Sequence, residues 1–403
     1  MIFQTKTKTP VTPITEIEKS SFCQEENDLK SKPLVEETKP NVRWQKIPIE
    51  YMRLTPEELD TRIAKSKNIL KEKLVILGHH YQRDQIIKYT DFQGDSFKLA
   101  QYTESISDLE YIVFCGVHFM AETADILSKD YQKVILPNLT AGCSMADMAT
   151  TEDVIDCWND LNEILGNNTI TPITYMNSAA AIKSICGKNQ GIVCTSSNAT
   201  KAMEWAFSNR EKILFIPDQH LGRNTAKKMN IKLEDMIVWN PFKELGGNTL
   251  DSIKNSKLIL WQGHCSVHTR FKPEQISNAK NKFPDINIIV HPECTMDVVD
   301  NSDFVGSTEY IIETINKSKP GSIWGIGTEI NLVNRIAKNN PDKTIFCLDS
   351  LVCPCSTMYR IHPAYLCWVL ESIEDGKIVN QIKVNNETTI NSKIALDRML
   401  SLN

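Results

Sequence analysis

An internal repeat is the feature of this 403-residue sequence that most restricts what it can fold into. Each of three stretches starts with an apolar, strand-like run that ends in polar residues: LVILGHHYQ at 74–82, PITYMNSAA at 172–180 and INIIVHPEC at 286–294. A hydroxyl-bearing turn, a helix, a second strand and helix, and a closing strand follow in each copy. The closing strands end in cysteine followed by serine, at Cys143-Ser144, Cys265-Ser266 and Cys355-Ser356.

Strands that alternate with amphipathic helices are typical of an α/β protein. We therefore expect three similar three-layer α/β/α domains, related by a pseudo-threefold axis around a central active site. Parallel sheets present ligands at the carboxyl ends of their strands, so the polar strand ends should face one shared cavity. The predicted organisation is a poorly ordered arm at 1–45, a first repeat at 46–150 on which C-terminal helices could pack, a second at 151–272 with an insertion near 230–256, and a third at 273–403 with a C-terminal helical segment.

Charge and hydropathy exclude several classes of function. The net charge is −5 and the basic residues form no block, so nothing favours nucleic acid as a partner. No window contains 18 consecutive apolar residues, which argues against a membrane span. The first residues, MIFQTKTKTP, lack the apolar core of a secretory signal. A cytoplasmic location is expected, or an organellar stroma if the chain is eukaryotic.

The chain has twelve cysteines and no CxxC pair, so a metal centre would need cysteines that lie far apart in sequence. The repeat points to Cys143, Cys265 and Cys355 as ligands. Three thiolates leave one iron of a cubane iron–sulfur cluster without a protein ligand. Cys353 is an alternative third ligand, although the Cys-Ser register favours Cys355. A zinc-dependent lyase with an open fourth position and an iron–sulfur redox sensor are the competing functions.

The remaining candidate residues lie at strand ends and at the predicted starts of helices. Acid–base and amide groups from the strand ends suit proton transfer on a small polar substrate. Hydroxyl groups at helix N-termini suit a phosphate or a carboxylate, because backbone N–H groups are free there. The strand-end residues are His79, His80, Tyr81, Tyr175, Asn177, His291 and Glu293, and the hydroxyl residues are Ser96, Ser196, Ser307 and Thr308.

Twelve motifs in order resemble the quinolinate synthase family, between about Leu74 and Met358. They are GHHYQ, GDSFKLA, VHFMAETADIL, AGCSMADM, YMNSAAAIK, CTSSNA, PDQHLGRNTA, WQGHCSVH, HPEC, VGSTEYII, IGTE and CPCSTM. The resemblance implies an enzyme of de novo NAD biosynthesis that condenses iminoaspartate with dihydroxyacetone phosphate to give quinolinate, phosphate and water. It also implies three α/β domains around a [4Fe-4S] cluster. An aspartate oxidase or dehydrogenase would supply the unstable iminoaspartate.

The resemblance also assigns roles to residues of this sequence. The implied cluster ligands are Cys143, Cys265 and the element that contains Cys353 and Cys355. The implied substrate-binding residues are His79, Ser96, Tyr175, Asn177, Ser196, His291, Glu293, Ser307 and Thr308, and Tyr81 also carries over. Our candidates for proton transfer are Glu293 and Tyr175, assisted by His291 or Tyr81.

Overall fold

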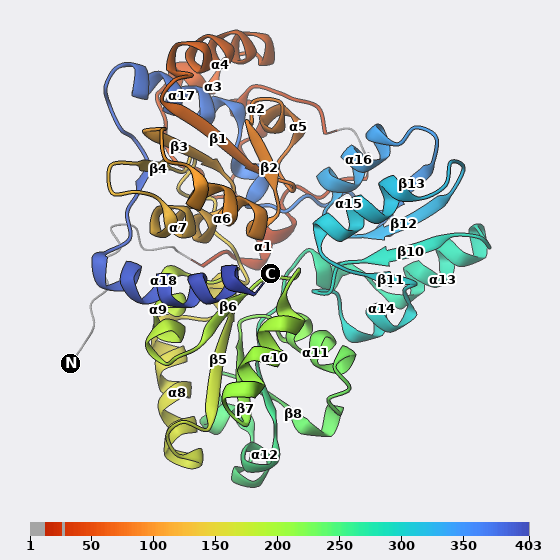
Figure 1. Cartoon of the computed structure of the whole chain (residues 1–403). Coiled ribbons are helices and arrows are strands. Elements are labelled where there is room, and N and C mark those ends of the chain that lie inside the picture. The colour runs from red at the N-terminus through yellow and green to blue at the C-terminus, as the bar shows by residue number, and fades with distance from the viewer. Residues whose placement is uncertain (1–12, 26–28, 403) are drawn as a thin grey trace.

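Three separate β-sheets form along the chain in the computed structural model, which describes residues 13–25 and 29–402. Each sheet is the centre of one lobe, and helices flank it (Figure 1). The predicted multi-domain α/β/α fold is confirmed, while the pseudo-threefold axis stays a prediction. Among the described residues, no helix is both long and apolar enough to cross a membrane.

The first sheet has the strand order β14-β4-β3-β1-β2. Strand β1 lies in its interior, and all six of its residues are buried. A continuous apolar run is what a strand with both faces covered requires. The strands are β1 (Leu74–His79), β2 (Phe92–Gly94), β3 (Tyr111–Cys115), β4 (Lys133–Ile135) and β14 (Gln381–Ile382), and the helices before and between them are α4 (Pro56–Leu70), α5 (Asp84–Ile87), α6 (Ser96–Ser105) and α7 (His118–Leu127).

The second sheet has the order β6-β5-β7-β9-β8 and is parallel throughout. Part of the insertion predicted near 230–256 forms the edge strand β8, which pairs with β9, so it extends the sheet. The strands are β5 (Ile170–Tyr175), β6 (Ile192–Cys194), β7 (Lys212–Ile216), β8 (Met236–Trp239) and β9 (Leu258–Trp261). The helices are α8 (Thr151–Leu165), α9 (Ala180–Lys188), α10 (Ala199–Asn209), α11 (Gln219–Lys228) and α12 (Leu250–Asn255), with the 3-10 turns η2 (Leu233–Asp235) and η3 (Glu244–Gly247).

The third sheet is smaller and has the order β11-β10-β12-β13. It is also parallel, and its central strands are apolar and buried. The strands are β10 (Asn287–Val290), β11 (Phe304–Val305), β12 (Ile323–Gly327) and β13 (Thr344–Cys347). The helices are α13 (Pro273–Lys282), α14 (Met296–Asn301), α15 (Thr308–Lys317) and α16 (Ile330–Asn339).

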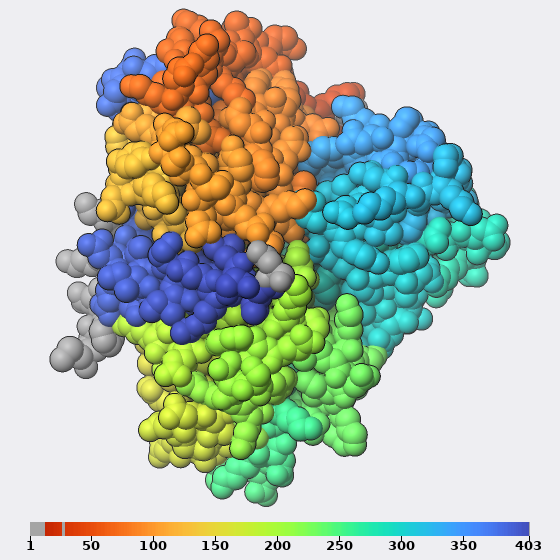
Figure 2. All heavy atoms as spheres, in the orientation of Figure 1, coloured from red at the N-terminus to blue at the C-terminus, as the bar shows by residue number. Residues whose placement is uncertain are grey.

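The C-terminal segment leaves the third lobe and returns to the other two. Helix α17 (Pro363–Glu374) packs on α4, and β14 adds an antiparallel edge to the first sheet beside β4. Helix α18 (Asn386–Ser401) packs on α9 and β6 of the second lobe and also contacts α7 of the first. Figure 2 shows this helix, in dark blue, filling the boundary between the first and second lobes. Helix α17 thus contacts the first lobe, and α18 contacts both the first and the second.

The described part of the N-terminal arm differs from the poorly ordered segment that its composition suggests. It contains the short helices α1 (Glu16–Ser20) and α2 (Leu34–Glu37), and α3 (Ile49–Met52) follows them. Its order comes from tertiary contacts, because Phe22, Leu34 and Val42 are buried and Cys23 forms a disulfide with Cys353. Residues 1–12 and 26–28 of the arm lie outside the described residues.

Candidate active site

Three loops with the same local structure carry the Cys-Ser pairs of the repeat. In each loop, a single 3-10 turn begins three residues after the cysteine, and a backbone N–H four residues after the cysteine donates to its carbonyl oxygen at 2.9–3.1 Å. The three turns are η1 (Ala146–Met148), η4 (His268–Arg270) and η5 (Met358–Arg360). The repeat seen in the sequence is therefore also a repeat of backbone conformation.

The three cysteines converge on one cavity, whose volume is about 70 Å³. Cys143, Cys265 and Cys355 all line it, and none of them forms a disulfide. Burial raises the pKa of each of these thiols above its ordinary value. Cys353, the alternative third ligand, does not line this cavity and is bonded to Cys23.

Most of the predicted substrate and catalytic residues line the same cavity. They come from all three lobes, as the repeat predicts. The residues are His79, Tyr81 and Ser96 from the first lobe, Tyr175, Asn177 and Ser196 from the second, and His291, Glu293 and Thr308 from the third.

Two of the predicted hydroxyl groups lie differently from the expectation. Ser307 is the N-cap of α15, where its Oγ accepts from the Tyr310 N–H, and it lines a neighbouring cavity. Ser196 lines the candidate active site but lies three residues before α10 instead of starting it. The reason is Asn198, whose side-chain oxygen accepts from the backbone N–H of Thr195 and holds a turn ahead of the helix.

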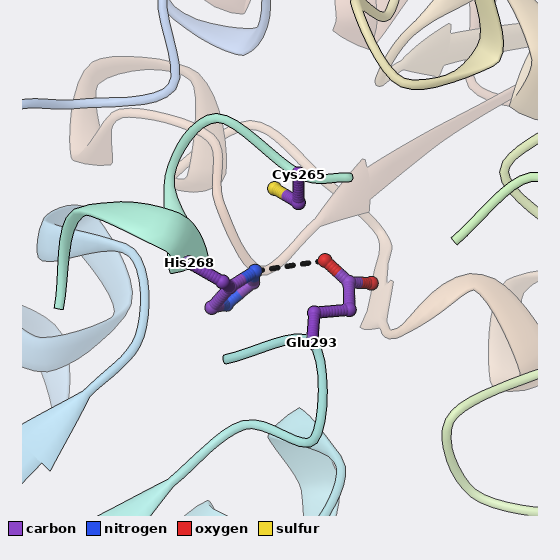
Figure 3. Close-up of side chains that lie close together, drawn as sticks. All are labelled: Cys265, His268 and Glu293. Carbon is purple, nitrogen blue, oxygen red and sulfur yellow. Dashed lines mark hydrogen bonds and ion pairs between the residues drawn. The ribbon is translucent and has the colours of Figure 1, made fainter. Parts of the chain in front are cut away.

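Glu293 is the centre of a buried hydrogen-bonded group. The Tyr175 hydroxyl donates to its Oε1 at 2.5 Å, and Nδ1 of His268 lies 2.8 Å from its Oε2. Figure 3 shows Glu293 and His268 facing each other, with the Cys265 side chain beside them. The His268 ring also stacks on His291, with ring centroids 4.5 Å apart. Both carboxylate oxygens therefore have a partner before any substrate is bound.

Thr328 extends this group to a second tyrosine. Its Oγ1 lies 2.9 Å from the Tyr81 hydroxyl and 3.1 Å from Nε2 of His268. An unbroken series of hydrogen bonds thus runs from Tyr81 through Thr328, His268 and Glu293 to Tyr175. Such a series can transfer a proton between two sides of the cavity.

Burial and neighbouring groups shift the pKa of several residues that line the cavity. Burial is the main cause that lowers the pKa of His79 and of His291 to about 3, so both imidazoles are neutral. Burial, with the Glu293 charge, raises the pKa of Tyr81 and of Tyr175 well above the ordinary value. Burial would raise the pKa of Glu293, but His268 beside the carboxylate and the hydrogen bonds from His268 and Tyr175 lower it. The site thus pairs an ionised carboxylate with protonated phenols.

Two buried polar atoms of the cavity residues have no hydrogen-bond partner among the described residues. They are Oδ1 of Asn177 and Oγ1 of Thr308. Unpaired buried polar atoms are costly, and at a functional site they commonly receive a ligand. These two atoms come from different lobes, so a small polar molecule that binds both would lie across the lobe boundary.

His268 and Thr328 are the functional candidates that sequence reasoning missed. His268 follows Cys265 by three residues, but Ala146 and Met358 occupy the matching positions of the other two loops. A search for residues that recur in the repeat therefore passes over it. The motif WQGHCSVH did contain the signal, because it places a second possible ligand only three residues after a cysteine that the repeat marks as a ligand.

Glu329 holds the loop of Cys355 in place by a hydrogen bond to its backbone. Its Oε1 accepts from the Cys355 N–H at 3.1 Å, and its Oε2 accepts from the Asn331 N–H at the start of α16. Burial raises the pKa of this carboxyl to about 7. The position of Cys355 is therefore fixed by a buried side chain as well as by the backbone.

The residues present fit a metal centre. Three unpaired thiols from three loops suit an iron–sulfur cluster, because thiolates are the usual ligands of such clusters. In addition, the ligand atoms of Cys265, His268 and Glu293 all lie within 4.8 Å of one another, and such a set could hold a single ion. The three-cysteine set is the one in which the repeat provides every member.

Comparison with known proteins identifies the family. The family described as "NadA: Quinolinate synthetase A protein" matches residues 61–401, which is most of the chain. This chain belongs to the quinolinate synthase family. The match confirms the resemblance drawn from the sequence motifs, and with it the expectation of an enzyme.

Individual relatives agree with the family match. The chain is 55% identical over 360 residues to a quinolinate synthase of Corynebacterium glutamicum, which covers 89% of this chain and 91% of the relative. It is 54% identical over 356 residues to one of Herpetosiphon aurantiacus, covering 88% and 95%. It is 52% identical over 360 residues to one of a Geobacillus species, covering 89% and 98%. The alignments thus extend over nearly the full length of these quinolinate synthases.

Proposed function

We propose that this chain condenses iminoaspartate with dihydroxyacetone phosphate to give quinolinate, phosphate and water in de novo NAD biosynthesis. The observation that carries the proposal is the convergence of Cys143, Cys265 and Cys355 on one cavity beside an ionised Glu293. Membership of the quinolinate synthase family supports quinolinate as the product. The cavity supplies acid–base groups, hydroxyls and amides for small, highly polar substrates.

The three cysteines would hold a [4Fe-4S] cluster. When bound, such a cluster supplies one iron without a protein ligand, which acts as a Lewis acid on a substrate oxygen. Cys355 is the third ligand in this proposal because Cys353 is joined to Cys23 and does not line the cavity.

Proton transfer falls to the hydrogen-bonded group around Glu293. The ionised carboxylate can accept a proton from a substrate carbon or nitrogen, and Tyr175 can donate one to a leaving hydroxyl. Tyr81 can act as a second proton donor. It can regain its proton through Thr328 and His268, which connect it to Glu293 by hydrogen bonds. The neutral ring of His291 stacks on His268 and keeps the carboxylate in place.

Substrate anions would bind near the starts of two helices, at the N–H groups that the N-caps Asp95 and Ser307 do not occupy; these N-caps already accept from Phe97, Lys98 and Tyr310. Ser96 and Thr308 are the first residues of α6 and α15, and both line the cavity. Helix N-termini attract carboxylate and phosphate without a lysine or arginine. The unpaired atoms of Asn177 and Thr308 add one acceptor and one hydroxyl from opposite lobes.

The test is iron and acid-labile sulfide per chain after anaerobic purification, for the parent and for Cys355→Ser and Cys353→Ser. We expect about four of each in the parent. Cys355→Ser should lose the cluster, whereas Cys353→Ser should keep it. Stoichiometric zinc without sulfide would refute the cluster and favour a zinc-dependent lyase. Cluster loss only in Cys353→Ser would move the third ligand by two residues.

Activity decides between an enzyme and an iron–sulfur sensor. The loaded parent should form quinolinate when an aspartate oxidase or dehydrogenase supplies iminoaspartate in the same vessel. Glu293→Gln preserves the size of the side chain and removes its charge, so quinolinate formation should fall while iron and sulfide stay unchanged. A parent with a full cluster that forms no quinolinate would refute the proposed reaction.

A further inference from the structure

The N-terminal segment at residues 13–25, here called the strap, lies before the region that the family match covers, which begins at residue 61. None of the described residues of the strap lines the candidate active site. The strap nevertheless contacts two of the three cysteine loops. Its helix α1 lies near the junction of the three lobes (Figure 1).

Contacts with the loop of Cys143 come from the start of the strap. The backbone N–H of Ile14 donates to Oδ2 of Asp147 at 3.4 Å. Asp147 belongs to η1 and donates its own N–H to the Cys143 carbonyl. Two hydrogen bonds, both made by Asp147, therefore connect the strap to the backbone of a proposed cluster ligand.

Contacts with the loop of Cys355 are covalent as well as polar. Cys23 is joined by a disulfide to Cys353, two residues before Cys355, across a sequence separation of 330. Gln24 and Val352 form an antiparallel bridge with N–H to carbonyl distances of 3.0 and 2.9 Å. The strap is thus attached to this loop at two adjacent residues.

A buried ion pair joins the strap to both loops at once. Glu18 and Arg360 are each 1% exposed, and Nη2 of Arg360 lies 2.9 Å from Oε1 of Glu18. Arg360 also donates to the carbonyl of Thr140, just before Cys143 in the chain. A second guanidinium, that of Arg43, contacts the same carboxylate at 2.7 Å. Because buried charges need partners, the carboxylate holds the loops of Cys143 and Cys355 at a fixed separation.

We propose that the strap is a redox-controlled clamp on the cysteine loops, closed by the Cys23–Cys353 disulfide and opened by a dithiol reductant. In the opening step, two electrons and two protons pass from the dithiol to the two sulfurs. The Cys23–Cys353 bond breaks, two thiols form, and the dithiol becomes a disulfide. Helix α1 has five residues, too few to be stable by itself, so the strap depends on its attachments. Opening would admit water and oxidants to the cysteine loops.

The inference rests on the proposed function in one respect, that the clamp would protect a bound cluster. The first measurement therefore tests the clamp in protein without the cluster. Trypsin cleavage after Lys19, whose side chain is 12% exposed, reports strap opening in the cluster-free protein by mass spectrometry. Cleavage should accelerate about thirtyfold in Cys23→Ser and in the dithiol-treated parent, the fold-change equivalent to the low end of a typical disulfide contribution. Cys347→Ser, which removes a free and half-buried thiol of the third lobe, is the matched control and should cleave at the parental rate.

A second measurement uses the loaded protein. The visible absorbance of the cluster should decay faster in air for Cys23→Ser than for the parent and for Cys347→Ser. Unchanged cleavage in the dithiol-treated parent, with both thiols shown to be free by alkylation, would refute the clamp. Recovery of Cys23 and Cys353 as unpaired thiols from air-exposed parent would refute it too. A parent that binds no cluster would contradict the proposed function. The cleavage test would still decide whether the clamp exists, because it is made on protein without the cluster.

Discussion

Removal of one hydroxyl, in Tyr175→Phe, tests whether the Glu293 group acts in the reaction. The hydroxyl donates to Oε1 of Glu293 at 2.5 Å, and both residues are buried. A hydrogen bond to a charged group contributes about 1.5–3 kcal/mol. If the transition state needs this whole contribution, kcat/KM falls by about 13- to 160-fold, since each 1.36 kcal/mol is a factor of ten.

The assay is quinolinate formation at matched iron and sulfide content, together with the free energy of unfolding in urea. Tyr365→Phe is the control. Tyr365 is equally buried, and its hydroxyl donates to the Gln45 carbonyl at 2.8 Å, but it does not line the cavity. The control should lose about 0.5–1.5 kcal/mol of stability and keep the parental kcat/KM.

The reasoning fails if Tyr175→Phe stays within about threefold of the parental kcat/KM while it is destabilised like the control. The bond to Glu293 would then be structural. It also fails if the variant loses its cluster, because the chemistry assigned to the phenol does not include holding the metal.

Two further predictions concern the contacts between lobes. Burial would raise the pKa of Glu309, but His80 and Lys98 lower it from 4.5 to about 2, so its stabilisation is present above pH 4.5 and is lost as the pH falls toward 2. Glu309→Gln should therefore lower the free energy of unfolding by about 1–2 kcal/mol at neutral pH, after allowance for solvent screening. Urea titrations should show this deficit shrinking in acid, and a pH-independent deficit would contradict the assignment. Gly187→Ala would place a methyl carbon 1.8 Å from the Asn391 carbonyl oxygen, so a thermal melt should show a loss of about 1–3 kcal/mol, and an unchanged melt would contradict the packing of α18 on α9.

The residues that the sequence singled out as a candidate site are largely those that recur in the repeat. Cys143, Cys265 and Cys355 lie in the loops that follow β4, β9 and β13, and the three loops share one backbone conformation. Strand ends such as those at Tyr175 and Glu293 were predictable for the same reason, because parallel sheets place them at one edge. Where a feature belongs to the repeat, sequence reasoning finds it.

Features that occur once were not predictable in this way. His268 has no equivalent in the other loops, and the Ser196 turn depends on a single asparagine side chain. The Cys23–Cys353 disulfide joins residues 330 positions apart, and no local pattern marks such a pair. The N-terminal arm is likewise ordered by tertiary contacts, and its polar composition gives no indication of them.

The return of the chain end to the first lobe has a consequence for synthesis. Strand β14 is the last strand of the chain, yet it completes the edge of the sheet that contains β1. While the chain emerges from a ribosome, β4 has an open edge until residue 382 has been made, and unpaired edges invite wrong pairing. The second and third sheets need no such wait, since their strands are contiguous in sequence. The lobe translated first would therefore complete its sheet only after the other two sheets have formed, and the second lobe also waits for the chain end, because α18 packs on its α9 and β6.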